Sequence, residues 1–249
     1  MFYFETKLNE LFSSSSTFFE HILSSITAIS AWAKSRKFGK AKRAKAILDK
    51  MQSLYESGII LQPPNIYCYT AVINTCAYSV PDAIENRDSL AVFMEVYKDM
   101  LKNMDEDGIG ANDDAKKRMV PNHITFSTVL TALRNLVPQD ERRVAATKSV
   151  FEKCTGMGMC DIGVVRRLQS FLDPVQLQDL FGPERVSTEG IVDLTQIPPA
   201  WSRNVLATPH KKRRRHTNKI SNNPNNNNHT NTTNRRKGSN RPSSKGNLK

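Results

Sequence analysis

The sequence predicts an all-α protein built from repeated helix–turn–helix units. Two stretches, "PPNIYCYTAVINTCAYSVP" at 63–81 and "VPNHITFSTVLTALRNLVP" at 120–138, match without gaps at a constant offset of 57 residues. In both stretches apolar residues recur at steps of three and four, which is the period of one helix face. Proline closes both stretches, where it ends a helix. An internal repeat of this kind decides the fold class before any other signal.

The two matching stretches open the second and third units of the repeat. Each predicts a helix that begins after a Pro–Asn pair and stops before Pro81 or Pro138. A second helix follows in each unit, over about 89–102 with Asp88 as N-cap and over about 141–153 with Asp140 as N-cap. The repeating element is therefore a pair of helices joined by a short turn.

Weaker units precede and follow these two. Apolar spacing predicts helices over 22–35 and 39–58 before them, and over 161–172 and 173–182 after them. The last pair is short, as is typical of the end of a repeat array. The predicted array covers 21–182, with the units 22–65, 66–122, 123–161 and 162–182.

Four further segments differ in composition. We expect an N-terminal segment, 1–20, that is partly disordered, and a solvated loop insertion at 103–118 whose acidic residues do not have the spacing of a calcium-binding loop. The extension 183–209 should pack on the last repeat through Trp201. The Asn-rich tail 210–249 has almost no apolar residues, so we expect it to be disordered.

The charge of the chain is concentrated in that tail. Residues 210–249 contain 12 Lys or Arg and no Asp or Glu. Subtracting these 12 from the 36 basic residues of the chain leaves 24, which equals its number of acidic residues. The body is therefore formally neutral, and the net charge of +12 is not evidence for a basic surface on the folded part.

Several classes of function find no support in the sequence. No apolar run reaches the length of a membrane span, and the N-terminus, with Glu5 and Glu10, does not read as a clear targeting signal. The four cysteines have no metal-binding spacing and read as reduced, buried thiols. No nucleophile, phosphate-loop or deaminase motif occurs. We expect no enzyme, metal, cofactor, membrane partner or small-molecule substrate.

Three stretches carry a resemblance to a known family: "AISAWAKS" at 28–35 in the first unit, and "IYCYTAVINTCA" and "HITFSTVLTAL", each directly after a Pro–Asn pair, in the second and third units. The paired helices resemble pentatricopeptide repeats. The resemblance covers 22–182, although the first three units are longer than the family's regular unit. It implies an α-solenoid that binds single-stranded RNA one base per repeat, in RNA processing, stability or translation. It also implies a location in the mitochondrion or plastid.

The resemblance assigns base reading to two pairs of residues, Thr70 with Asn122 and Ser127 with Asp161. An amide suits adenine and a carboxylate suits the donor edge of guanine, so the family's code implies A then G, read 5′ to 3′. Ile26 in the first unit and Arg166 in the fourth do not fit the code. The alternative is that Thr70 and Ser127 are ordinary solvent-facing residues.

Basic residues of the tail would contact RNA phosphates without reading sequence, or form a nuclear localisation signal. They are Lys211, Lys212, Arg213, Arg214, Arg215, Arg235, Arg236 and Lys237. A different reading of the whole chain is a tetratricopeptide-like scaffold that holds a protein partner, but the pattern of that repeat is absent.

Overall fold

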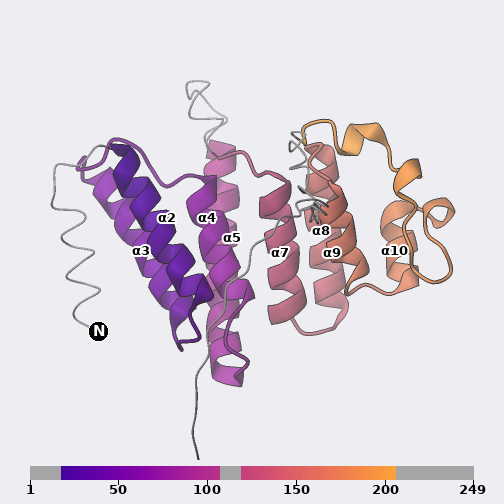
Figure 1. Ribbon diagram of the computed structural model, residues 1–249, viewed down its shortest axis with the longest axis horizontal. Coiled ribbons are helices and arrows are strands. Elements are labelled where there is room, and N and C mark those ends of the chain that lie inside the picture. The colour runs from indigo at the N-terminus through magenta and orange to yellow at the C-terminus, as the bar shows by residue number, and fades with distance from the viewer. Residues whose placement is uncertain (1–17, 107–118, 206–249) are drawn as a thin grey trace, which may run out of the picture. The chain divides into compact units, whose positions relative to one another are not determined.

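The computed structural model describes residues 18–106 and 119–205, which are mostly helical (Figure 1). The prediction of an all-α protein is confirmed, since these residues contain no β-strand beyond an isolated bridge between Val186 and Val192. Eight α-helices follow one another: α2 (Phe18–Lys34), α3 (Lys40–Glu56), α4 (Ile66–Ala77), α5 (Ala83–Glu106), α7 (His123–Leu136), α8 (Glu141–Gly156), α9 (Ile162–Gln169) and α10 (Pro174–Phe181). Three short 3-10 helices complete the described chain: η1 (Pro183–Arg185), η2 (Leu194–Gln196) and η3 (Pro199–Trp201).

Consecutive helices pack in pairs, α2 with α3, α4 with α5 and α7 with α8 (Figure 1). The first helices of neighbouring pairs also pack on one another, α2 on α4, α4 on α7 and α7 on α9. Among the second helices α3 contacts α5, but α5 and α8 are not among the described pairs that share an extended contact. The first helices therefore form the continuous part of the packing.

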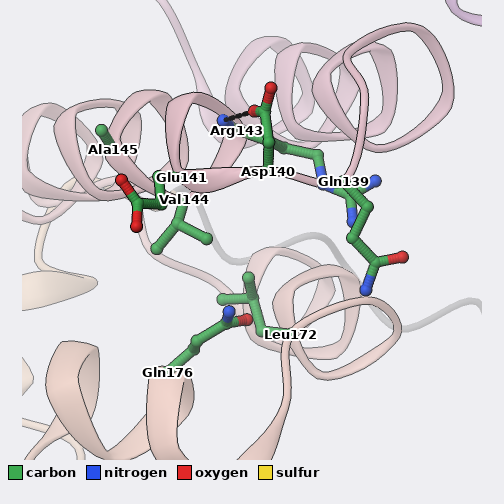
Figure 2. A pocket seen from close by; sticks show the side chains of 8 residues that line it. All are labelled: Gln139, Asp140, Glu141, Arg143, Val144, Ala145, Leu172 and Gln176. Carbon is green, nitrogen blue, oxygen red and sulfur yellow. Dashed lines mark hydrogen bonds between the residues drawn. The ribbon is translucent and has the colours of Figure 1, made fainter.

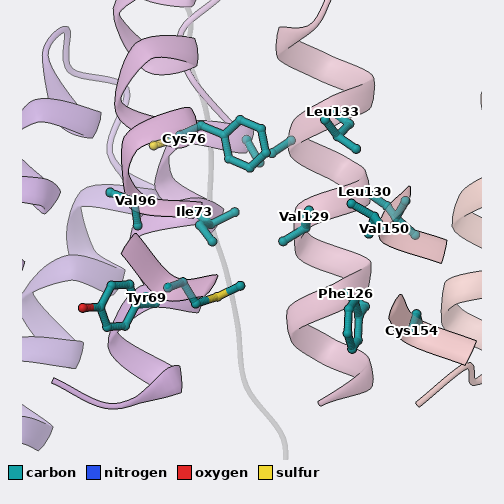
Figure 3. Packing of buried hydrophobic residues seen from close by; sticks show 14 of the residues in the cluster. Tyr69, Ile73, Cys76, Val96, Phe126, Val129, Leu130, Leu133, Val150 and Cys154 are labelled. Atoms are coloured by element: carbon teal, nitrogen blue, oxygen red, sulfur yellow. The ribbon is translucent and has the colours of Figure 1, made fainter. Parts of the chain in front are cut away.

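Apolar side chains from both helices of each pair build one core (Figure 3). In α4 and α7 the face predicted from the helical period is buried, because each of these helices packs against its own partner and the first helices on both sides. Labelled members of the core come from α4, α5, α7 and α8: Tyr69, Ile73, Cys76, Val96, Phe126, Val129, Leu130, Leu133, Val150 and Cys154.

The helix α5 corrects two predictions. It begins at Ala83 rather than about 89, because Oδ1 of Asp82 accepts the N–H groups of Ile84 and Glu85 at 2.9 and 3.0 Å and so caps the helix. It also continues to Glu106, so the first four residues of the predicted 103–118 insertion are helical. Asp88, predicted as the N-cap, lies inside the helix and forms an ion pair with Lys42 of α3.

A buried carboxylate joins the first two pairs. Both oxygens of Glu85 accept the N–H of Gly39, at 2.8 and 2.9 Å, at the point where α3 begins. Gly39 has φ of 72°, a left-handed conformation that glycine adopts without a Cβ penalty. Next to it, buried Lys40 donates from Nζ to the carbonyls of Ala33 and Ser35. The turn between α2 and α3 is thus attached to the start of α5.

The C-terminal extension covers the ends of α8 and α10. The Trp201 ring meets Phe151 edge-on, with 5.4 Å between ring centroids, and lies 6.1 Å from the Phe181 ring. The Asn204 N–H donates to the carbonyl of Gly158 at 2.9 Å, which fastens the extension to the loop after α8. Trp201 therefore packs against the last helices, as the sequence predicts.

Three groups of predictions lie outside the described residues. They concern the N-terminal segment up to residue 17, the insertion from 107 to 118 and the whole basic tail. Within the described ranges, no helix has both the length and the apolar character needed to cross a membrane.

Candidate nucleic-acid interface

Three first helices begin at a side-chain cap that the sequence reading did not assign. Asn65, Asn122 and Asp161 stand directly before α4, α7 and α9, and each Oδ1 accepts a backbone N–H of the first turn. A short polar side chain before an apolar periodic run is the ordinary signal for such a cap. Two of these residues, Asn122 and Asp161, are the ones predicted to read bases, so each would have a structural role as well.

Hydrogen bonds connect Thr70 to Asn122 through Thr125. The hydroxyl oxygens of Thr70 and Thr125 lie 2.9 Å apart, across the contact between α4 and α7. Oδ1 of Asn122 accepts the N–H of Thr125 at 3.0 Å and its hydroxyl at 3.3 Å. Thr125 is buried, whereas Thr70 and Asn122 are half-buried. The structure therefore brings the first predicted pair together.

The hydrogen bonds inside the protein determine which group of the first pair is left to accept, and which to donate, a hydrogen bond from or to a ligand. Two hydroxyl hydrogens serve three contacts, because Thr70 also donates to the carbonyl of Ile66 at 2.7 Å. With the hydrogen of Thr70 donated to the carbonyl of Ile66, its hydroxyl oxygen is left as an acceptor toward a ligand. Asn122 uses Oδ1 for the cap, and its Nδ2 group is left as a donor.

The second predicted pair lacks such a connection. Oδ1 of Asp161 accepts the N–H of Val164 at 2.8 Å, and Val164 stands where α7 has Thr125, three residues after the cap. Valine has no hydroxyl to reach back toward Ser127, and no hydrogen bond joins Ser127 to Asp161 in the described chain. Asp161 also lines a cavity of about 410 Å³ with Leu194 and Val205 of the C-terminal extension.

Exposed apolar side chains accompany the predicted reading positions. Leu23, Tyr67 and Ile124 each stand three residues before Ile26, Thr70 and Ser127, on the same side of their helices. They are 54%, 60% and 56% exposed although they are apolar or aromatic. The helical period did not predict these three residues, because they lie outside the buried face of their helices. Their recurrence at the same position of the repeat could have identified them.

A cavity of about 290 Å³ lies where α5, α7 and the end of α8 meet. Its walls are mostly apolar and include Met100, Met104 and Met157, with Thr125 on one side and Lys153 as its charged residue. Residues of both second helices, α5 and α8, line it. Methionine side chains adapt to ligands of irregular shape.

A second, more polar cavity of about 390 Å³ lies between the start of α8 and the start of α10 (Figure 2). Arg143, Gln139 and Glu141 line it together with Leu172 and Gln176. Asp140 uses Oδ1 to cap α8 by accepting the N–H of Arg143 at 3.2 Å, as the dashed line in Figure 2 shows. The Arg143 guanidinium lies over the Phe171 ring, so this charge is packed rather than free.

The thiols offer no reactive group. Cys68, Cys76, Cys154 and Cys160 are free and buried. Burial raises the pKa of Cys68 to about 11 and that of Cys76 to about 12, so both stay protonated at neutral pH. Within 18–106 and 119–205, no group of three or more His, Cys, Asp or Glu side chains is placed to hold a metal ion.

Comparison with protein-family models, with curated proteins and with solved structures finds no match to this chain. The candidate interface therefore rests on the geometry of its own residues. The tail residues Lys211 to Arg215 and Arg235 to Lys237 lie outside the described ranges, and their predicted roles stay predictions.

Proposed function

We propose that this chain is a sequence-selective single-stranded RNA-binding adaptor of the pentatricopeptide type, without catalysis, in RNA processing, stability or translation. Its paired helices would stack as an α-solenoid, with the first helices lining the RNA-binding side. The observation that carries the proposal is the hydrogen-bonded set Thr70, Thr125 and Asn122 between α4 and α7. It offers one acceptor and one donor to a base from two adjacent repeats.

The exposed apolar residues support the same proposal. A base held between Tyr67 and Ile124 would stack on an aromatic ring on one side and an aliphatic chain on the other while its edge meets Thr70 and Asn122. Such stacking contributes about 1–3 kcal/mol per base whatever its identity. The hydrogen-bonding pairs would then add the preference for A followed by G that the family's code implies.

Contacts to two bases do not supply the free energy of binding that a micromolar complex requires. Two bases at about 1–3 kcal/mol each give about 2–6 kcal/mol. A micromolar complex requires about 8 kcal/mol. Phosphate contacts must provide the difference, and the basic tail is one source of them. Organellar location, the mitochondrion or plastid, remains part of the proposal, with the nucleus as the rival that the KKRRR run suggests.

Fluorescence anisotropy with the full-length chain tests the proposal. The probes are ten-nucleotide single strands with AG at the centre of a pyrimidine sequence, the same strand with the two bases permuted, and the AG strand in a duplex. We expect at least about tenfold tighter binding of the AG single strand than of either control. Equal affinity for single strand and duplex would contradict the proposal.

A protein-binding scaffold is the second candidate function, and the methionine-lined cavity between α5, α7 and α8 favours it. In that case a protein partner would occupy the cavity. Its capture would not change in a variant carrying Thr70→Ala and Ser127→Ala, and purified complexes would contain no RNA. RNA in the complex that disappears with this double variant would favour the RNA-binding function instead.

A further inference from the structure

Three arginines, Arg134, Arg166 and Arg167, lie in the last turns of α7 and α9, the first helices of the third and fourth units. Nη1 of Arg134, on α7, donates to Oγ of Ser170 at 3.3 Å, directly after α9. Ser170 follows Arg166 by four residues and Arg167 by three, so all three belong to one turn of α9. Because α7 packs on α9, the Arg134 guanidinium lies beside the turn that carries the other two.

These arginines have no carboxylate partner among the described residues, where the ion pairs involve Lys42, Lys45 and Arg185. Nε of Arg167 is buried and has no hydrogen-bond partner, which is costly for a charged donor. Arg134 and Arg166 are exposed. Within the part of the chain that the structure describes, no carboxylate forms an ion pair with this cluster of three arginines.

The residues around the cluster include a further basic side chain and two acidic helix caps. Arg143 adds a fourth guanidinium, since its Nη1 donates to the carbonyl of Arg134 at 3.3 Å. Asp140 caps α8 and Asp173 caps α10, each through Oδ1, and neither forms an ion pair with these arginines among the described residues. Basic side chains of a formally neutral body thus lie together at one end of its candidate interface.

We infer that Arg134, Arg166 and Arg167 bind the phosphodiester backbone of the RNA, on the 3′ side of the two bases read by the second and third units. This rests on the proposed function. Arg166 stands five residues after the Asp161 cap, as Ser127 stands five after Asn122 and Thr70 five after Asn65, so it continues the row of reading positions. A guanidinium at this position would hydrogen-bond a phosphate instead of a base, and this role accounts for the residue of the fourth unit that does not fit the code.

Salt dependence gives the signature of this contact. For a single strand, each neutralised phosphate contributes about 0.7 to the slope of log affinity against log salt. Two phosphates held by the cluster contribute about 1.4, so raising salt from about 50 to 200 mM costs about sevenfold in affinity through these contacts alone. Base stacking and edge contacts do not produce this dependence.

The test uses the full-length chain and the AG single strand extended by four pyrimidines on its 3′ side. The variant carries Arg134→Gln, Arg166→Gln and Arg167→Gln. The control carries Lys98→Gln, Arg142→Gln and Lys148→Gln, which removes the same charge from exposed positions on second helices. We expect the slope to fall by about 1.4 in the variant and to stay near the wild-type value in the control.

Neutral linkages locate the contact on the RNA. Replacing the two phosphodiesters 3′ of AG with methylphosphonates should weaken binding to the wild type and the control, and should leave binding to the variant unchanged. The same replacement on the 5′ side should affect all three proteins alike. The single variant Arg166→Gln, at an exposed position, should reproduce part of the effect if the triple variant proves unstable by circular dichroism.

The outcomes separate the two proposals. A wild-type chain that shows no base preference overturns the proposed function, and this inference with it. A wild type that selects AG while variant and control have the same slope and the same response to methylphosphonates overturns the inference alone. An acidic protein captured by the wild type but not by the variant, without RNA, would assign the cluster to a protein partner instead and would also overturn the inference.

Discussion

Asn122 is proposed to perform two tasks with the two ends of one amide group. Its oxygen caps α7 through the Thr125 N–H, and its nitrogen is the proposed donor to a base. The two tasks can be separated by substitution, because an aspartate keeps an oxygen for the cap but replaces the donor by an acceptor. An alanine removes both.

We predict that Asn122→Ala lowers the free energy of unfolding by about 0.5–2 kcal/mol through loss of the cap, whereas Asn122→Asp leaves it nearly unchanged. Both variants should lose the preference for adenine at the first base, and the aspartate should shift it toward guanine. Urea unfolding and anisotropy on the same samples measure the two effects. An aspartate variant that still prefers adenine would show that Asn122 acts only as a cap.

Thr125 supports this pair without facing the ligand itself. We predict that Thr125→Val, which imitates Val164 of α9, reduces the preference for the correct first base about fivefold, the equivalent of one ordinary hydrogen bond. Thr125→Ser should restore it, and the preference at the second base should not change in either variant. The ratio of dissociation constants for the four bases at each position is the readout; equal losses at both positions would point to general misfolding.

The sequence predicted which residues form the first pair but not how they are held. Thr70 and Asn122 came from their places in the repeat, and the structure brings them together. Thr125 could not be recognised, because its role depends on the packing of α4 against α7 and not on any spacing within one helix. For Asp161, the extension that shares its cavity is distant in sequence and gave no local signal.

Among the elements, α5 shows how a local signal can be read in the wrong place. Asp82 and Asp88 both look like caps, and only Asp82 accepts first-turn N–H groups. Starting the helix at Ala83 places Glu85 in its first turn, inside the protein, where it reaches the N–H of Gly39. The earlier start of α5 is therefore what links the first unit to the second.

This link gives a prediction on stability. Glu85→Ala should lower the free energy of unfolding by about 2–4 kcal/mol, because it leaves the Gly39 N–H without an acceptor and buried Lys40 without its neighbouring charge. Asp88→Ala, which removes the partly exposed ion pair with Lys42, should cost no more than about 1 kcal/mol. Chemical denaturation of both variants is the measurement, and similar losses would contradict the assigned role of Glu85.

At the scale of the whole molecule, the buried thiols make stability depend on alkaline pH. Cys68 and Cys76 ionise near 9.0 when unfolded, but in the folded state burial holds their pKa values at about 11 and 12. Above pH 9 the folded protein therefore binds more protons than the unfolded chain, and stability falls as pH rises. Each thiol contributes about 1.4 kcal/mol per pH unit.

We expect the free energy of unfolding to be insensitive to these thiols below pH 8 and to decrease between pH 9 and 10.5. Desolvation lowers the pKa of Lys40, which opposes this trend in the same range. The variant Cys68→Ala and Cys76→Ala should therefore show a shallower fall, or a rise, over this interval. Urea unfolding under reducing conditions measures it, and identical slopes for wild type and variant would contradict the prediction.

The order of the helices and the pairing within the first three units followed from the sequence, since the repeated stretches carry both the helical period and the closing prolines. The unequal packing between pairs could not be predicted in this way. A difference between side chains accompanies it. Glu85 has a partner in the preceding unit, whereas Arg143, at the matching place in α8, contacts Arg134 of its own unit and Phe171 of the following unit. Such differences appear only when distant segments meet.

The junction between the second and third pairs has a mechanical consequence. The first helices of these pairs, α4 and α7, are joined by hydrogen bonds near both ends. Thr70 bonds Thr125 at one end, and Nδ2 of Asn135 donates to the carbonyl of Ala77 at 2.8 Å at the other. The second helices α5 and α8 lack a comparable seam among the described contacts. We therefore expect α5 and α8 to move apart more easily than α4 and α7, whose spacing these two hydrogen bonds hold constant.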